Sequence, residues 1–200
     1  MRQGEHREVQ NLDGLVVDSG DQWQSCRFVK CSFRGSRLIE VITKQCGFEE
    51  CDLTGARLGS SIHTSTGFLN CKFVDADFYG ATFEQCRMVG SDFAGANLSD
   101  IRVKQGDWSY VQLRMHELDG LDLSGVKLVG ADLYGSSLKA AILQNALLKD
   151  VNLSHAKLHR ADLRGADLTG VQLKDVELKG ARMNVEQALL FAVCHGIIIE

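Results

Sequence analysis

Apolar side chains recur at every fifth position along most of this chain. Counting in steps of five from Trp23 to Met183 gives 33 central positions, of which 31 hold Leu, Phe, Trp, Met or Val. Thr43 and His63 are the two exceptions. A period of five fits neither the 3.6-residue period of an α-helix nor the alternation of a β-strand, so it predicts a repeat architecture.

A second inward position precedes each central position by two residues. From Cys26 to Ala181, 29 of these 32 small positions hold Ala, Cys, Ser, Val, Thr or Gly, and the exceptions are Ile101, His116 and Leu121. A unit with two inward and three outward residues can turn one corner of a square, so four units close a coil. We expect coils stacked as parallel strands about 4.8 Å apart, which roughly eight times over make a rod of about 40 Å. The sequence thus predicts an all-β solenoid, a quadrilateral parallel β-helix.

Glycine and proline fit this interpretation. Twelve of the 20 glycines occupy the last position of the five-residue unit, where Asn70 and Asn145 also occur. Both residue types tolerate the positive φ of a tight corner. Proline is absent from the chain, which suits a structure in which nearly every backbone N–H joins a ladder.

The two ends of the chain differ from the repeats. Residues 1–21 do not follow the count, which would place Asp13 and Asp18 at central positions, and we expect a mobile tip and an N-terminal cap there. Residues 22–183 form the β-helix without insertions. From Asn184 a helix is predicted, with Asn184 as N-cap, Gln187 completing a capping box and Gly196 ending it. The third domain, 184–200, therefore comprises a capping and dimerisation helix and a tail strand.

The predicted helix carries more apolar side chains than a cap needs. One stripe, which we expect to close the open end of the rod, consists of Val185, Ala188, Leu189 and Ala192. The apolar residues outside that stripe are Leu190, Phe191, Val193, Ile197 and Ile198. A two-fold homodimer through the C-terminal end would bury them, and the alternative is a monomer with an apolar cap.

Two places interrupt the regular pattern. Thr43 and His63 share one column when residues 20 apart are stacked, so they either leave the core or hydrogen-bond inside it. Between Ile101 and His116, bulky side chains occupy small positions, which predicts a bulge, a kink or a change of cross-section. A ligand-binding role for His116 is the weaker alternative.

Six of the seven cysteines occupy small positions, where they serve as compact apolar side chains. Cys31, Cys51 and Cys71 would share one column, but parallel stacked side chains are poorly aimed for a disulfide. We therefore predict reduced thiols and a cytoplasmic protein, with a disulfide as the alternative. The sequence shows no secretory signal or membrane-length apolar run, so we expect no membrane association.

The sequence offers no catalytic constellation. It lacks a paired nucleophile and base, a glycine-rich phosphate loop and a Cys/His cluster at metal-ligand spacing. We therefore expect neither an enzyme nor a cofactor or metal. Twenty-two Lys and Arg against 26 Asp and Glu give a net charge of −4 without a basic stripe, which disfavours direct nucleic-acid binding.

Several short motifs accompany the repeat. They are Gly180-Ala181-Arg182-Met183-Asn184-Val185-Glu186-Gln187-Ala188, Phe191-Ala192, His195-Gly196, Thr82-Phe83, Gln85-Cys86, Met88 and Gly90-Ser91. In these motifs the chain resembles the pentapeptide-repeat proteins that act on DNA gyrase, and most of all the mycobacterial proteins that confer fluoroquinolone resistance. The resemblance implies a right-handed β-helix that forms a homodimeric rod, imitates duplex DNA, binds DNA gyrase, modulates or inhibits it and lowers sensitivity to fluoroquinolones. The uninterrupted repeat departs from the plasmid-borne members, which carry projecting loops.

Such mimicry would rest on local acidic clusters, because duplex DNA carries about 24 negative charges over 40 Å. The candidates are aspartates that directly precede central positions, and those nearest the proposed dimer centre are Asp122, Asp132, Asp162 and Asp167. We predict that these four contact gyrase. The alternative role of each is to hydrogen-bond the backbone of its own corner. The alternative function is a structural or scaffold solenoid that binds a different protein partner.

Overall fold

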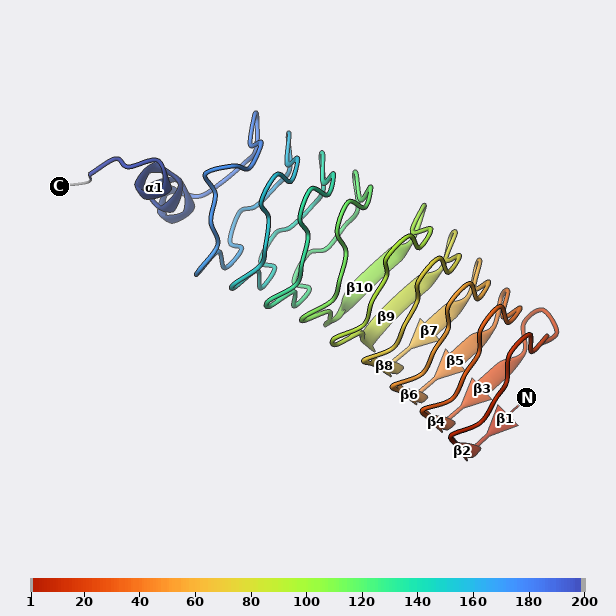
Figure 1. Ribbon diagram of the computed structural model, residues 1–200. Helices are drawn as coiled ribbons and strands as arrows, with labels where there is room; N and C mark the ends of the chain where they lie inside the picture. The colour runs from red at the N-terminus through yellow and green to blue at the C-terminus, as the bar shows by residue number, and fades with distance from the viewer. Residues whose placement is uncertain (1, 199–200) are drawn as a thin grey trace.

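The computed structural model describes residues 2–198 as a rod of stacked, four-sided coils with a helix at one end (Figure 1). The predicted fold class is confirmed: the chain is a right-handed quadrilateral parallel β-helix followed by a short α-helix. The elements are β1 Arg2–Gln3, β2 His6–Glu8, β3 Gln22–Gln24, β4 Arg27–Val29, β5 Ile42–Lys44, β6 Gly47–Glu49, β7 Ile62–Thr64, β8 Gly67–Leu69, β9 Thr82–Arg87, β10 Arg102–Asp107 and α1 Val185–Cys194.

Each coil has four faces, and residues 20 apart in sequence lie above one another. We name the faces by their first central residues, face A for Trp23, face B for Phe28, face C for Phe33 and face D for Leu38. Strands β3, β5, β7 and β9 stack on face A, and β4, β6 and β8 stack on face B. Because β9 and β10 run around the corner between these faces, both stacks belong to one sheet. Elsewhere isolated parallel bridges join the coils.

The central and small side chains form one continuous core. Up to Trp108 the core is largely a stack of aromatic rings, with the ring centroids of Phe48 and Phe68 only 4.7 Å apart. Beyond Trp108 leucine occupies the central positions, and these leucines are buried up to Leu173. Aromatic rings bury large areas and stack at these distances favourably, so the two parts of the rod are filled by different means.

Thr43 and His63 remain inside the core. His63 Nδ1 lies 2.8 Å from Thr43 Oγ1, and its Nε2 lies 2.9 Å from Ser61 Oγ. Thr66 extends this buried chain, with its Oγ1 2.9 Å from that of Thr43. Burial lowers the pKa of His63 to about 3, so the imidazole is neutral and both ring nitrogens are satisfied. Of the two alternatives that the sequence left open, internal hydrogen bonding is the one that the structure adopts.

Cysteine and serine side chains at small positions satisfy carbonyl groups inside the rod. Cys71 Sγ lies 3.4 Å from the carbonyl oxygen of Phe48, and Ser91 Oγ donates to that of Phe68 at 2.9 Å. The same contact with the central carbonyl 23 residues earlier is made by Cys46, Cys51 and Cys86. The cysteines are free thiols, and they act as weak donors as well as compact fillers.

The described residues of the predicted tip and N-terminal cap, 1–21, build a complete first coil. Its strands pair with the next coil at an offset of 21 residues, as in Arg7 opposite Phe28, instead of 20. The extra residue lies in the corner closed by the Asp21 N–H and the Asp18 carbonyl. A count in steps of five misses this shift and therefore fails to place Leu12 at an inward position.

The predicted irregularity near Ile101 is confirmed as an opening between two coils. On faces D and A, the backbone N–H groups of Leu98, Asp100 and Val103 have no partner in the next coil among the described residues. One coil earlier, the equivalent N–H groups of Phe78 and Gly80 each bond to the coil that follows. The coils stay joined on faces B and C, so the rod opens as a wedge on the other two sides.

The cause lies in the oversized small positions. Ile101 and Leu121 occupy the same corner in successive coils, where most other coils hold Ala, Val or Ser. His116 occupies the preceding corner, and its Nε2 lies 2.9 Å from the Phe93 carbonyl oxygen. Since a packed core cannot absorb extra volume without backbone shifts, the coils separate at this corner. Its contact with Phe93 gives His116 a structural role.

Helix α1 closes the C-terminal end, but with a different face from the predicted one. Gln187 is buried, and its Nε2 donates to the carbonyls of Leu163 (2.5 Å) and Ala166 (2.8 Å). The apolar side chains that pack on the core are Leu190, Phe191 and Cys194. The predicted stripe is wrong, since Val185 is 75% exposed and Leu189 is 44% exposed. The capping box of Asn184 and Gln187 is confirmed.

Candidate partner-binding surfaces

The four predicted aspartates share one local geometry. Each lies just before a central residue, and its Oδ1 accepts a hydrogen bond from the backbone N–H two residues later, at distances from 2.9 to 3.2 Å. This bond ties the carboxylate to its own corner, which is the structural role that the sequence left open for these residues. The corner hydrogen bond uses only Oδ1, so the Oδ2 of each carboxylate can accept a hydrogen bond from another group.

Asp162 is the most enclosed of the four. Arg164 donates to it from Nε at 2.9 Å and from Nη2 at 2.6 Å, and Gln144 Nε2 donates at 2.7 Å. These hydrogen bonds, chiefly those from Arg164, hold the pKa of Asp162 well below its usual range. The side chain is only 11% exposed, so Asp162 stabilises the rod and offers little to a partner.

Asp132 is also engaged within the rod. Its Oδ2 accepts from Arg114 Nη1 at 2.9 Å, and its Oδ1 accepts from Asn152 Nδ2 at 3.0 Å. Arg114 in turn lies over the ring of Tyr134, 4.4 Å from the centroid. The charge of Asp132 is therefore largely balanced by its neighbour.

Asp122 and Asp167 are the open pair. Apart from its own corner, Asp122 bonds only to Ser124, and Asp167 only to Thr169, within the described residues. The Thr169 hydrogen bonds lower the pKa of Asp167, which keeps it ionised at neutral pH. Neither carboxylate has an ion-pair partner in the described part of the chain.

The four carboxylates do not form one surface. Asp122 and Asp162 lie in one column of face A, with Ile142 between them. Asp167 lies on the neighbouring face B above Leu147, whereas Asp132 lies on face C, on the opposite side of the rod from face A. The structure places Asp122 and Asp162 two coils apart on face A and Asp167 on the adjoining face B, and it separates Asp132 from all three.

The residues predicted for dimerisation divide between two faces of α1. Leu190 and Phe191 pack on the rod, whereas Val193 and Ile197 are each 57% exposed and Ile198 is exposed as well. The outer face of α1 is completed by Val185 and Leu189, which the sequence had assigned to the cap. We call Val185, Leu189, Val193, Ile197 and Ile198 the outer apolar stripe. No strand follows α1 in residues 195–198, and the rest of the predicted tail strand lies outside the described residues.

The described residues contain no group of three or more His, Cys, Asp or Glu side chains placed to hold a metal ion. Within the same residues, no helix has the length and apolar character needed to cross a membrane.

Comparison with known proteins places the chain in a family. Residues 60–138 match the family described as pentapeptide repeat region, and residues 146–184 match eight copies of pentapeptide repeats. A comparison with curated protein sequences finds no match.

The solved structures similar to the chain are of the same kind. A trypsin-treated form of QnrB1, a plasmid-mediated fluoroquinolone resistance protein, is 21% identical with a TM-score of 0.86, over 100% of this chain and 99% of that one. Full-length QnrB1 is 22% identical with a TM-score of 0.59, over 96% and 100% of the two chains. HetL, from the cyanobacterium Nostoc, is 28% identical with a TM-score of 0.49 over 90% of each chain. The first of these similarities establishes the fold, and with the repeat matches it shows that this chain belongs to the pentapeptide-repeat family.

Proposed function

We propose that this protein is a DNA-mimicking rod that binds DNA gyrase, modulates or inhibits it, and thereby lowers sensitivity to fluoroquinolones. The observation that carries the proposal is the similarity of the whole chain, both ends included, to a fluoroquinolone resistance protein. The C-terminal motif supports it, since it resembles that of the mycobacterial fluoroquinolone-resistance protein MfpA. The proposed role is binding in the cytoplasm, without catalysis or a cofactor.

The ends of the rod support a homodimer through the C-terminus. At the N-terminal end Arg7 and Glu5 occupy inward positions and pair with each other, so that end is closed by charged groups. At the other end the outer apolar stripe is uncovered. A polar terminal coil keeps a solenoid soluble, whereas an apolar one favours association, so a second copy would dock at α1.

Of the four predicted aspartates, we propose that Asp122 and Asp167 are the two whose charges contact gyrase. They flank one edge of the rod near the proposed dimer centre and have no cation partner in the described chain. Asp132 and Asp162 would contribute shape and stability, because their charges are balanced by Arg114 and Arg164. A dimer would extend the same edge across both subunits and bring two such pairs to gyrase.

The test is DNA supercoiling by gyrase from the cognate bacterium, titrated with the protein, with and without ciprofloxacin. We expect dose-dependent loss of supercoiling or of drug-stabilised cleavage. Asp122→Lys with Asp167→Lys should weaken the effect at least tenfold, because two favourable charges become repulsive. The matched control is Asp92→Lys, since Asp92 makes the same corner hydrogen bond but lies far from α1. No effect of the wild-type dimer at large excess would refute the proposal.

The alternative is a structural or scaffold solenoid for another protein partner. The observation in its favour is the net charge of −4, which is small for a DNA mimic. A scaffold would bind its partner without competition from DNA. Adding duplex DNA to a gyrase-binding assay at several salt concentrations therefore separates the two functions.

A further inference from the structure

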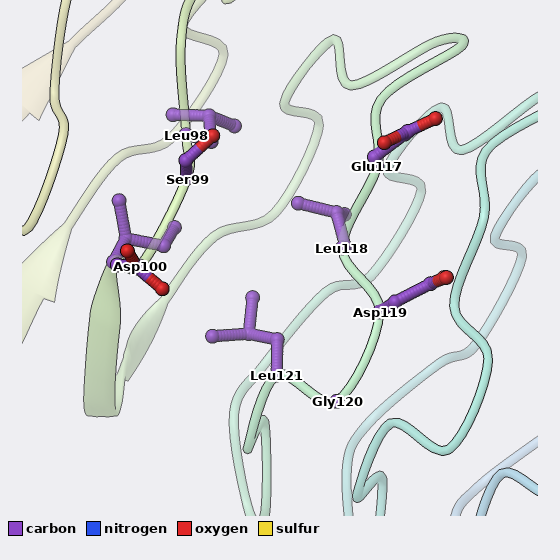
Figure 2. Close-up of a pocket in the computed structure, with 9 residues that line it drawn as sticks. Leu98, Ser99, Asp100, Glu117, Leu118, Asp119, Gly120 and Leu121 are labelled. Atoms are coloured by element: carbon purple, nitrogen blue, oxygen red, sulfur yellow. The ribbon is translucent and has the colours of Figure 1, made fainter.

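The wedge between the coils contains a cleft of about 360 Å³ (Figure 2). Its lining residues are Leu98, Ser99, Asp100, Ile101, Glu117, Leu118, Asp119, Gly120 and Leu121. In Figure 2 the side chains of Leu118 and Leu121 project from one coil into the gap, toward the segment that carries Leu98. The volume lies within the range of pockets that hold ligands.

The walls of this cleft are two unpaired backbone edges, one of which continues into β10. On one wall the N–H groups of Leu98, Asp100 and Val103 point at no partner among the described residues. On the other wall the N–H groups of Glu117 and Asp122 lack the bonds to the previous coil that Asn97 and Arg102 make one coil earlier. Exposed strand edges are templates for an added strand, because the main chain of a guest supplies the missing donors and acceptors.

The interior behind the cleft carries a second unsatisfied group. Trp108 is 2% exposed, and its Nε1 has no hydrogen-bond partner in the described chain. The ring borders a small apolar cavity whose lining includes Leu98, Ile101, Leu118 and Leu121, the same side chains that line the cleft. A buried indole N–H without a partner is uncommon, and it marks the core beside the cleft as imperfectly packed.

The charged side chains at the rim of the cleft indicate that its ligand carries positive charge. Asp100 and Glu117 lie on opposite walls, and neither side chain has a hydrogen bond or ion pair within the described residues. Asp119 is already occupied, since it accepts from Ser137 Oγ at 2.5 Å and from the Lys139 N–H at 2.9 Å. The nine lining residues include three carboxylates and no basic side chain. A rim of this kind complements Lys or Arg, whose aliphatic stem can lie along the leucines.

We propose that this cleft binds an extended, basic segment of a protein partner, which adds as a strand between the two coils. Main-chain hydrogen bonds to both open edges hold the segment, alternate apolar side chains contact the leucines, and separate Lys or Arg side chains meet Asp100 and Glu117. The inference does not rest on gyrase binding, because the segment would bond to open backbone edges in the middle of the rod, whereas the proposed gyrase contact at Asp122 uses its carboxylate (Figure 1).

Hydrogen exchange on the full-length protein is the first test. In the free protein, the amides of Leu98, Asp100, Val103, Glu117 and Asp122 should exchange at least tenfold faster than those of Phe78 and Gly80, because they lack ladder bonds. The probe is the synthetic peptide acetyl-Val-Lys-Val-Lys-Val-Lys-Val-amide. At saturation it should slow exchange of the five cleft amides at least tenfold.

Three controls assign the binding to its parts. A peptide with Glu in place of Lys tests the charge, and a peptide N-methylated at alternate residues tests the main-chain bonds. Asp100→Asn with Glu117→Gln should raise the peptide Kd about tenfold, and Asn suits the left-handed corner at position 100 (φ 58°). Asp75→Asn with Glu177→Gln changes the same positions of the unit elsewhere and should leave the Kd unchanged.

Three results would overturn the proposal. Slow exchange of the cleft amides in the free protein would show that the coils are closed in solution. Fast exchange without protection by the lysine peptide would leave a cleft that holds solvent only. Equal affinity for the lysine, glutamate and N-methylated peptides would mean adsorption to the leucines without strand addition.

Discussion

In the N-terminal part of the rod, up to Trp108, aromatic rings occupy most central positions and short strands line faces A and B. In the C-terminal part leucine replaces the rings, and from Leu118 to Leu178 the carbonyl of each central residue accepts a turn hydrogen bond from the N–H three residues later. In the N-terminal part this turn bond occurs on faces C and D. This difference in hydrogen bonding explains why cysteine occurs at small positions of the N-terminal part. Where a corner has that turn bond, as at Leu123, Ala or Val suffices at the small position. Where it is absent, as at Phe48 and Phe68, Cys71 and Ser91 donate to the carbonyl in its place, and at Phe48 this bond is made in addition to the β6–β8 ladder.

At the junction between the aromatic part and the leucine part, the coils do not pack regularly on each other. Ile101, His116 and Leu121 are the three oversized small positions, and two of them, Ile101 and Leu121, line the cleft. A solenoid is held together by contacts between neighbouring coils alone, so a weak junction divides it into two units. The comparison therefore predicts different responses to substitution on the two sides.

The largest effect should come from the aromatic core. Phe73 is fully buried against Phe68, Phe78 and Phe93. We expect Phe73→Ala to lower the free energy of unfolding by about 4 kcal/mol, against about 3 kcal/mol for Leu153→Ala on the same face of the leucine part. Urea denaturation measures both. A larger loss at Leu153 would show that the rings are not the better packed core.

Acid should weaken the N-terminal part selectively. His63 has a folded-state pKa of about 3 because of burial, whereas an unfolded histidine titrates near 6.5. Below about pH 6.5 the unfolded chain binds the proton and the folded chain does not, so stability falls as the pH falls toward 3. We expect a loss of about 2 kcal/mol between pH 7 and pH 5, measured by urea denaturation.

The matched variant for this prediction is His63→Leu, which places the usual residue at a central position. It should be less stable at pH 7, since Thr43 and Ser61 lose a partner, yet its stability should change by less than half as much between the two pH values. Burial lowers the pKa of His116 as well, so a smaller dependence of the same sign should remain. An unchanged slope in the variant would contradict the assignment to His63.

Replacing a cysteine that donates a hydrogen bond should change the free energy of unfolding less than the substitutions above. Cys71→Ala removes one of two donors to the Phe48 carbonyl, the other being the Leu69 N–H of the β6–β8 ladder, and should cost about 0.5–1 kcal/mol, whereas Cys71→Ser should cost less than half as much. In the leucine part the order should reverse, because Ala146 faces a carbonyl, that of Leu123, which its turn already satisfies. Ala146→Ser is therefore expected to destabilise. Thermal denaturation of these three variants decides whether cysteine acts as a donor or only as a filler.

The smallest change in stability, less than about 1 kcal/mol, is expected from Ile101→Ala with Leu121→Ala. The lost burial should be offset as the coils close and ladder bonds form across faces D and A. Hydrogen exchange should show the amides of Leu98 and Val103 becoming as protected as that of Phe78. Faster exchange throughout this region would show that the two side chains hold the junction together.

The sequence alone determined the coil. A period of five with two inward residues allows only one way to bury every apolar side chain, and Asn184 with Gln187 marks the start of α1 because local hydrogen bonds define a helix cap. It also located the irregular junction, since a residue too large for its position is visible without coordinates. The aspartates next to the central residues were correctly recognised as having a possible structural role.

Only the tertiary structure decided what depends on contacts between coils. The one-residue shift of the first coil, the engagement of Asp162 by Gln144 and the pairing of thiols with carbonyls 23 residues earlier all join residues that no local pattern links. The same holds for α1, whose inner face was set by Gln187 reaching the carbonyls of Leu163 and Ala166. Apolar residues surround much of this helix, so its pattern alone could not orient it. The orientation of the helix was decided by the buried side-chain amide of Gln187, because a buried polar group requires hydrogen-bond partners.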